Sequence, residues 1–163
     1  MKDNKRVASI LLEKNWTVST AESCTGGLLA HTITNASGSS NYFSNGYITY
    51  SDEAKMQELN IPKDAIEEFS SYSGKVAELM AEEVRKKSHS TFGIATTGIA
   101  PPGDSSSSFP TGTIFIGIST ANKLEHFEFF LRNKSRKRFK RKVVKLALNL
   151  LREIVTEQMS KKT

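Results

Sequence analysis

The chain has few of the residues that form disulfides or bind structural metals, with one cysteine and three histidines among its 163 residues. A single cysteine excludes an internal disulfide and a zinc site built from several thiolates. No segment approaches the roughly 20 consecutive apolar residues that a membrane-spanning helix needs. The charged start at residues 1–6 is followed by no apolar core of secretory type. We therefore expect a cytoplasmic protein that does not bind membranes.

Basic charge is present but concentrated in one short segment. The net charge is +6, and residues 132–142 hold eight basic side chains and no acid, which leaves the rest of the chain at −2. Such a segment favours an anionic partner nearby. One hypothesis is a nucleic-acid-binding module that uses residues 132–142. The alternative is a solvated helix face, and we do not expect nucleic acid to be the main partner.

Hydrophobic periodicity predicts helices that alternate with strands along one domain, residues 1–163. The main helices are expected over 3–14, 25–34, 74–88 and 135–158. The strands are expected over 17–21, 46–50, 92–97, 113–119 and 124–131. A late hairpin is antiparallel, whereas helical crossovers favour parallel strands. We therefore predict an α/β fold of three layers, α/β/α, with a mixed, mostly parallel sheet.

The segment from Thr20 to Gly27 holds a hydroxyl, a thiol and two glycines where a strand passes into a helix. Backbone N–H groups at a helix start are unpaired, and we expect them to point outward towards a phosphate or an oxyanion. Ser23 is a candidate nucleophile if a base can reach it. Cys24 is a rival as a thiolate, although a lone cysteine is more often a small buried residue.

A lysine is the better candidate for the base, because none of the three histidines is placed to serve Ser23. Tyr50 ends a predicted strand, and Ser51 and Lys55 follow at helical spacing. Neighbouring parallel strands align their C-terminal ends, which would bring this corner to Ser23. Lys55 must be neutral to accept a proton, so it needs burial or a nearby cation to lower its pKa. The alternative is that Lys55 is an ordinary solvated lysine.

The strand over 92–97 ends in Thr97 and Gly98, ahead of a long loop over 98–112. Thr97 and Gly98 could present a hydroxyl and an N–H group to the same crevice. The plainer interpretation is a strand end followed by a turn. Loops of this length in compact domains are usually functional or mobile.

Taken together, these segments resemble the CinA C-terminal-domain family over about residues 4–155. The matching motifs are Ala21-Glu22-Ser23-Cys24-Thr25-Gly26-Gly27, Gly38-Ser39-Ser40, Gly46-Tyr47, Tyr50-Ser51-Asp52-Glu53-Ala54-Lys55, Thr97-Gly98-Ile99-Ala100 and Gly112-Thr113. Their order and spacing both fit, so the resemblance is specific although each motif alone is weak.

The resemblance implies a nicotinamide-nucleotide amidase, which converts nicotinamide mononucleotide to nicotinate mononucleotide and ammonia in the recycling of NAD. It implies Ser23 as nucleophile and Lys55 as general base, with Tyr50 assisting proton transfer. The residues that it implies for holding the nucleotide are Thr25, Gly26, Gly27, Thr97, Gly98 and Arg136. It calls for no metal or cofactor, and its partner is the small nucleotide substrate.

Two departures from the family pattern affect the substrate end of the site. Pro101 stands where the family usually has glycine, which removes an N–H group and fixes φ. Lys134-Ser135 stands where the family often has Gly-Asp. A nucleotide-binding homologue without activity is therefore a further alternative. We also expect a symmetric homo-oligomer, as is common among α/β domains of this size.

Overall fold

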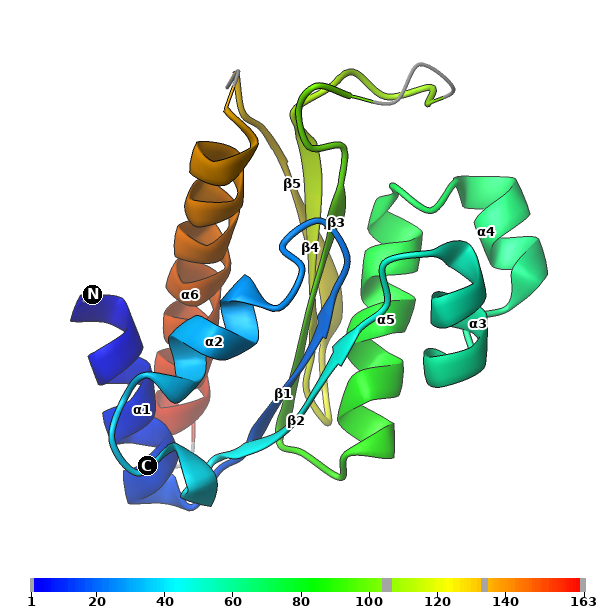
Figure 1. Cartoon of the computed structure of the whole chain (residues 1–163). Coiled ribbons are helices and arrows are strands. Elements are labelled where there is room, and N and C mark those ends of the chain that lie inside the picture. The colour runs from blue at the N-terminus through cyan, green and yellow to red at the C-terminus, as the bar shows by residue number, and fades with distance from the viewer. Residues whose placement is uncertain (1, 104–106, 133–134, 162–163) are drawn as a thin grey trace.

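A computed structural model describes residues 2–103, 107–132 and 135–161, and it places one mixed sheet between two layers of helices (Figure 1). The elements are α1 (Lys2–Lys14), β1 (Val18–Glu22), α2 (Leu28–Thr34), η1 (Ser39–Asn41), β2 (Phe43–Ile48), α3 (Asp52–Leu59), α4 (Lys63–Phe69), α5 (Gly74–Lys87), β3 (Phe92–Gly98), β4 (Thr113–Ser119), β5 (Leu124–Phe130) and α6 (Arg136–Ser160). The three-layer α/β/α prediction is confirmed.

The two faces of the sheet carry separate hydrophobic clusters. Figure 1 shows α1, α2 and α6 on one face and α3, α4 and α5 on the other. Side chains alternate along a strand, so one strand serves both layers. In β3, Phe92 and Ile94 join the cluster beneath α6, whereas Ala95 joins the cluster beneath α5. This alternation decides which side chains can reach the helices on each side.

The strand order is β2-β1-β3-β4-β5. The pairs β1–β2 and β1–β3 are parallel, and the pairs β3–β4 and β4–β5 are antiparallel. Glu22 is in register with Ile48 on one side and with Thr96 on the other. The three parallel strands therefore end at one edge of the sheet. The late hairpin and the mixed sheet agree with the prediction from the sequence.

Two predicted boundaries were wrong near this edge. The second strand spans Phe43–Ile48 rather than 46–50, because its pairing with β1 ends where β1 ends, so Tyr50 lies beyond the strand. Helix α2 begins at Leu28 rather than near Thr25. Gly26 and Gly27 have φ values of +58° and +92°, which form a left-handed turn ahead of the helix.

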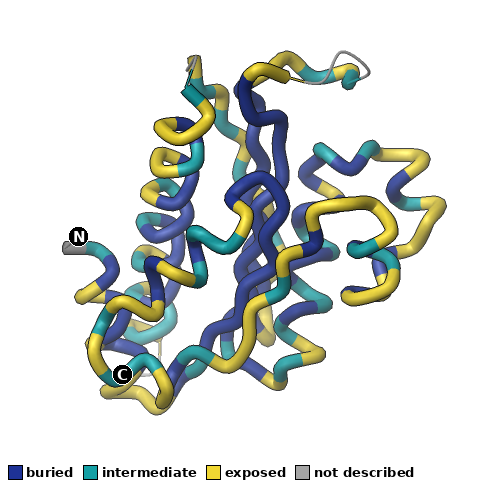
Figure 2. Tube along the Cα trace, viewed as in Figure 1, coloured by how far each residue is buried: buried dark blue, intermediate teal, exposed yellow. Residues whose placement is uncertain are grey.

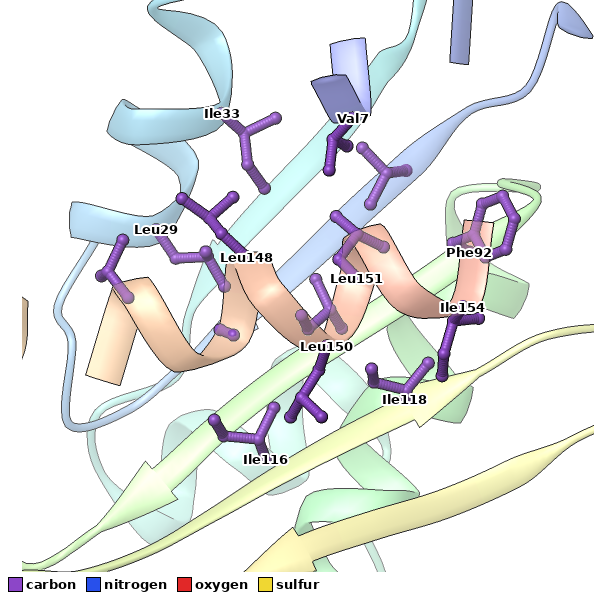
Figure 3. Packing of buried hydrophobic residues seen from close by; sticks show 14 of the residues in the cluster. Val7, Leu29, Ile33, Phe92, Ile116, Ile118, Leu148, Leu150, Leu151 and Ile154 are labelled. Carbon is purple, nitrogen blue, oxygen red and sulfur yellow. The ribbon is translucent and has the colours of Figure 1, made fainter. Parts of the chain in front are cut away.

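The apolar face of α6 packs along the sheet and supplies much of the larger cluster. Leu148, Leu151 and Ile154 are among its buried residues, and Ile116 and Ile118 of β4 belong to the same cluster (Figure 3). Strands β1, β3 and β4 are buried along their whole length, while β2 and β5 form the more exposed edges (Figure 2). Ser23 therefore follows directly after a fully buried strand.

Helix α5 lies very close to the sheet over two glycines. A Cβ atom on Gly93 would lie 2.0 Å from the carbonyl oxygen of Ala81, and one on Gly117 would lie 2.1 Å from that of Ala77. Because glycine has no side chain at these positions, the backbone of α5 can pack directly on the backbone of β3 and β4. The close approach sets the position of the whole α5 layer relative to β3 and β4.

We predict that Gly93→Ala destabilises the fold by about 1–3 kcal/mol, because the added methyl group forces α5 away from the sheet. Thermal denaturation measures this as a fall of the midpoint by about 2–4 °C per kcal/mol. Ser44→Ala on the exposed strand β2 is the control and should leave the midpoint unchanged. An unchanged midpoint in Gly93→Ala would contradict the close packing.

Candidate active site

A cavity of about 170 Å³ opens at the edge where β1 and β3 end. Its walls come from the turn after β1, the segment after β2, the segment before α5, the loop after β3 and the start of α6. They are formed by Ser23, Cys24, Tyr50, Tyr72, Gly98, Ile99, Ala100, Gly103 and Arg136. The structure thus brings together Ser23, Tyr50, Gly98 and Arg136, four residues that the sequence predicted for the site.

The turn that carries Ser23 is held by the carboxylate of Glu22, which is 1% exposed. Its Oε2 atom accepts hydrogen bonds from the Thr25 hydroxyl at 2.6 Å, the Gly27 N–H at 3.0 Å and the Leu29 N–H at 2.9 Å. Its Oε1 atom accepts one from the Ala30 N–H at 2.8 Å. The expectation that the N–H groups at the start of α2 face a ligand is wrong for these three. Because a buried carboxylate needs donors, they turn inward.

Thr25 and Thr96 join this turn to the neighbouring strand. Their hydroxyl oxygens lie 2.7 Å apart, and the N–H of Ser23 donates to the carbonyl of Thr96 at 2.9 Å. The Thr25 hydroxyl also donates to Glu22. Sequence reasoning missed Glu22 and Thr96 as structural partners, since their strand positions resemble ordinary alternation. The only signal was that Glu22 is a charged residue at the end of an otherwise uncharged, buried strand.

The predicted role of Thr97 needs correction. Thr97 is fully buried, and its hydroxyl donates to the carbonyl of Ser71 at 2.8 Å instead of facing the cavity. Alternation along β3 directs Thr96 to the α2 side and Thr97 to the α5 side. The hydroxyl of Ser71 in turn donates to Asp52. Thr97 therefore joins β3 to the segment before α5, and Gly98 is the residue of this pair that lines the cavity.

Lys55 is buried, being 1% exposed on α3, so the interpretation as a solvated lysine is wrong. Burial is the largest influence on its pKa and lowers it, while the carboxylate of Asp52 and the Cys24 thiol act in the opposite direction. The Nζ atom lies 3.6 Å from Oδ1 of Asp52. Lys55 does not line the cavity itself.

Cys24 does not have the character of a nucleophile. Burial raises the pKa of its thiol to about 12, and the nearby charge of Glu22 acts in the same direction. The thiol is therefore protonated at neutral pH, whereas the attacking species would be the thiolate. Ser23, which precedes it and faces the same cavity, stays the better candidate.

Arg136 closes one side of the cavity. Its guanidinium donates to the hydroxyl of Tyr50 through Nη2 and, at 2.9 Å, to the carbonyl of Pro101 through Nη1. Pro101 lacks an N–H group but still contributes its oxygen. These two contacts connect the start of α6 with the segments after β2 and β3. In the same loop, Ser105 lies outside the described residues, as does Lys134 of the basic segment.

The remaining predicted substrate residues line a second pocket. Thr25, Gly26 and Gly27 form one wall of a pocket of about 520 Å³, with α6 opposite. Apart from Lys55 and Thr97, which line neither, the predicted site residues are therefore divided between two pockets beside the Ser23 turn and the start of α6. Of the histidines, His31 lines this second pocket and His126 pairs with Glu78, so none of the three reaches the Ser23 cavity.

Within the described parts of the chain, no three His, Cys, Asp or Glu side chains gather as a metal site requires. The described helices also lack the combination of length and hydrophobicity that crossing a membrane requires. The residues that line the cavity carry hydroxyl groups, a thiol, small apolar side chains and one guanidinium.

Comparison with known proteins agrees with this arrangement. The CinA C-terminal domain matches residues 2–155 of the sequence. The chain belongs to the CinA C-terminal domain family. A CinA-like protein of Flavobacterium psychrophilum is 42% identical over 157 residues, which are 95% of this chain and 36% of that protein. The chain thus spans about a third of the length of the curated relatives that it matches.

Solved structures of the CinA superfamily share the fold. A CinA superfamily protein from Klebsiella pneumoniae superposes with a TM-score of 0.91 at 25% identity, covering 96% of this chain and 97% of that one. The competence/damage inducible protein CihA from Agrobacterium tumefaciens gives 0.88 at 32% identity, with 92% of both chains covered. The α/β/α arrangement of this CinA domain is therefore that of its family.

We predict that Glu22→Gln destabilises this CinA domain by about 1.5–3 kcal/mol. The substitution replaces one acceptor atom by an NH₂ group facing backbone donors, and hydrogen bonds to charged groups are worth that amount. Chemical denaturation would measure the change. Glu68→Gln at an exposed position of α4 is the matched control and should be neutral. Equal stability of the two variants would contradict the role of Glu22.

We also predict that Lys55→Met raises the melting temperature. Burial lowers the pKa of Lys55 in the folded state. The unfolded chain therefore binds the proton more tightly than the folded one. The buried ammonium lowers the free energy of unfolding, and this loss of stability is fully present at pH values below the folded pKa. Removing about 1 kcal/mol of this cost raises the midpoint by about 2–4 °C.

This gain should be largest in mildly acidic buffer and shrink as the pH rises to the usual lysine pKa of about 10.4 and beyond, since above it the parent amine is neutral in both states. Lys63→Met, at an exposed position that pairs with Glu67, is the control and should show no such dependence. A variant that melts below the parent protein at every pH would contradict the prediction.

Proposed function

We propose that the chain is an amidohydrolase that converts nicotinamide mononucleotide to nicotinate mononucleotide and ammonia, with Ser23 as nucleophile and Lys55 as general base. Family membership supports the proposal. The observation that carries it is that Ser23 lines a cavity while Lys55, on α3, is buried and has a lowered pKa. A hydroxyl needs such a base before it can attack an amide.

In the proposed reaction, Oγ of Ser23 attacks the carboxamide carbon while its proton passes to the neutral amine of Lys55. The oxyanion needs donors, and those of Gly27, Leu29 and Ala30 are already bound to Glu22. We propose the N–H groups of Cys24 and Thr25 for this purpose, since that of Gly26 donates to the carbonyl of Ser23. Lys55 returns the proton to the leaving nitrogen as the C–N bond breaks. Water then hydrolyses the acyl ester, which yields the carboxylate and restores the hydroxyl.

We propose that Tyr50, in the wall of the same cavity, assists this proton transfer. Its hydroxyl accepts a hydrogen bond from Arg136, so it keeps its own proton available for the cavity. The cavity, at about 170 Å³, is smaller than the roughly 300–1,000 Å³ of usual small-molecule pockets. We infer that it receives the carboxamide end of the substrate, and that the ribose and the phosphate extend beyond it.

We predict that Ser23→Ala and Lys55→Met each lower the release of ammonia from nicotinamide mononucleotide by about 10³-fold or more, with the fold intact. The parent rate should rise with pH through the folded pKa of Lys55, because only the neutral amine accepts a proton. Ser44→Ala and Lys63→Met are the matched controls. Undiminished turnover in either active-site variant would remove the assigned mechanism.

Comparison with nicotinamide riboside separates catalysis from recognition of the phosphate. A much higher KM for the riboside with a similar kcat is expected if the phosphate mainly contributes binding. Binding of the nucleotide without release of ammonia by the parent protein would identify a homologue without activity instead.

A further inference from the structure

The second pocket, next to the Ser23 cavity, is lined on one side by three cations of α6. Lys137, Lys140 and Arg141 face the turn at Gly26 across a pocket of about 520 Å³. The three residues have the spacing i, i+3 and i+4, which places them on one face of the helix. No acidic side chain lines this pocket in the described part of the chain. The pocket is therefore concave and carries positive charge.

These cations lie where the rest of α6 carries its apolar stripe. Continuing the same spacing leads to Val144, then to Ala147 and Leu148, all of which are buried against the core (Figure 3 shows the further course of this face). On this face Lys137 and Arg141 are exposed at the rim of the pocket. Lys140 is itself half-buried there.

The ammonium of Lys140 reaches the backbone of the turn because Gly26 has no side chain. A Cβ atom on Gly26 would lie 3.0 Å from Nζ of Lys140, and the positive φ of Gly26 also disfavours other residues. Within the described residues, Lys137, Lys140 and Arg141 form no ion pair with a carboxylate. Their charge is available to a ligand.

The N–H groups of Gly27, Leu29 and Ala30 cannot serve such a ligand, since Glu22 accepts their hydrogen bonds. Side chains must therefore supply the binding. We propose that Lys137, Lys140 and Arg141 form a phosphate subsite, separate from the Arg136 wall of the Ser23 cavity. An ammonium and a guanidinium on one face suit a phosphate group, to which they donate charge-assisted hydrogen bonds.

The position of the subsite gives it a role in the choice of substrate. Arg136 donates to Tyr50 and Pro101 at the wall of the Ser23 cavity. The three cations follow it on α6 and face Thr25, Gly26 and Gly27, which come directly after Ser23 and Cys24. A ligand with its carboxamide at Ser23 would extend its phosphate towards them. This role, unlike the subsite itself, rests on the proposed function. A nucleotide phosphate and a free phosphate ion offer the pocket the same chemistry.

Binding of inorganic pyrophosphate, measured by titration calorimetry at low ionic strength, tests the subsite without any turnover. We expect saturable binding that Lys140→Gln weakens about tenfold or more, because one charge-assisted hydrogen bond is lost. Lys137→Gln should weaken it similarly. Lys142→Gln, an exposed neighbour on α6 that does not line the pocket, is the matched control and should bind as the parent does.

Competition identifies the source of the phosphate. Displacement of pyrophosphate by nicotinamide mononucleotide, but not by the riboside, would support the phosphate of the substrate as occupant. Displacement by inorganic phosphate alone would support a free ion. Absence of saturable binding, or equal loss in Lys140→Gln and Lys142→Gln, would overturn the subsite, and the latter would indicate a surface for polyanions such as nucleic acid. Loss of amidase activity without loss of pyrophosphate binding would refute only the proposed function.

Discussion

The carboxylate of Glu22 accepts one hydroxyl and three backbone N–H groups, and the arrangement of the site depends on this cluster. A buried carboxylate is costly unless donors surround it, so the turn between β1 and α2 has little freedom to adopt another shape. Ser23, which begins this turn, is also held by the hydrogen bond from its N–H group to the carbonyl of Thr96. The same bonds withdraw the start of α2 from any ligand. Positive charge for an anion must therefore come from side chains, and α6 is the element that brings them.

The polarity of the sheet provides the second constraint. Because β1, β2 and β3 are parallel, the segments that follow them meet at one edge. The segment after β1 leads to α2 on one face, and the segment after β2 leads to α3 on the other (Figure 1). Ser23 and Lys55 thus approach the edge from different layers. Lys55 is buried, and the loss of contact with water is the main cause of its lowered pKa.

Several features of the site could be predicted from the sequence. The parallel strand ends predicted that Ser23 meets the corner of Tyr50 and Lys55, and the family resemblance added Arg136. Ser23, Tyr50 and Arg136 line one cavity, whereas Lys55 does not line it. Thr97 was one residue in error, because a strand sends successive side chains to opposite faces and the residue facing the Ser23 turn is Thr96. The end of β2 was misplaced because an edge strand with mixed burial has no clear apolar alternation. The basic segment was recognised as a feature, but its division between an arginine in one pocket and three cations in another could not be seen.

The sequence by itself determined the layers, the hairpin and the turn with its two glycines, because these follow from local periodicity and backbone preference. It also contained the short motifs that place the chain in its family. Only the tertiary structure decided that Lys55 is buried, that Cys24 is a protonated thiol and that Glu22 faces inward. Burial and charge pairing depend on residues distant along the chain, whose distances are set by the packing of both helical layers on the sheet. Local pattern carries no information about those distances.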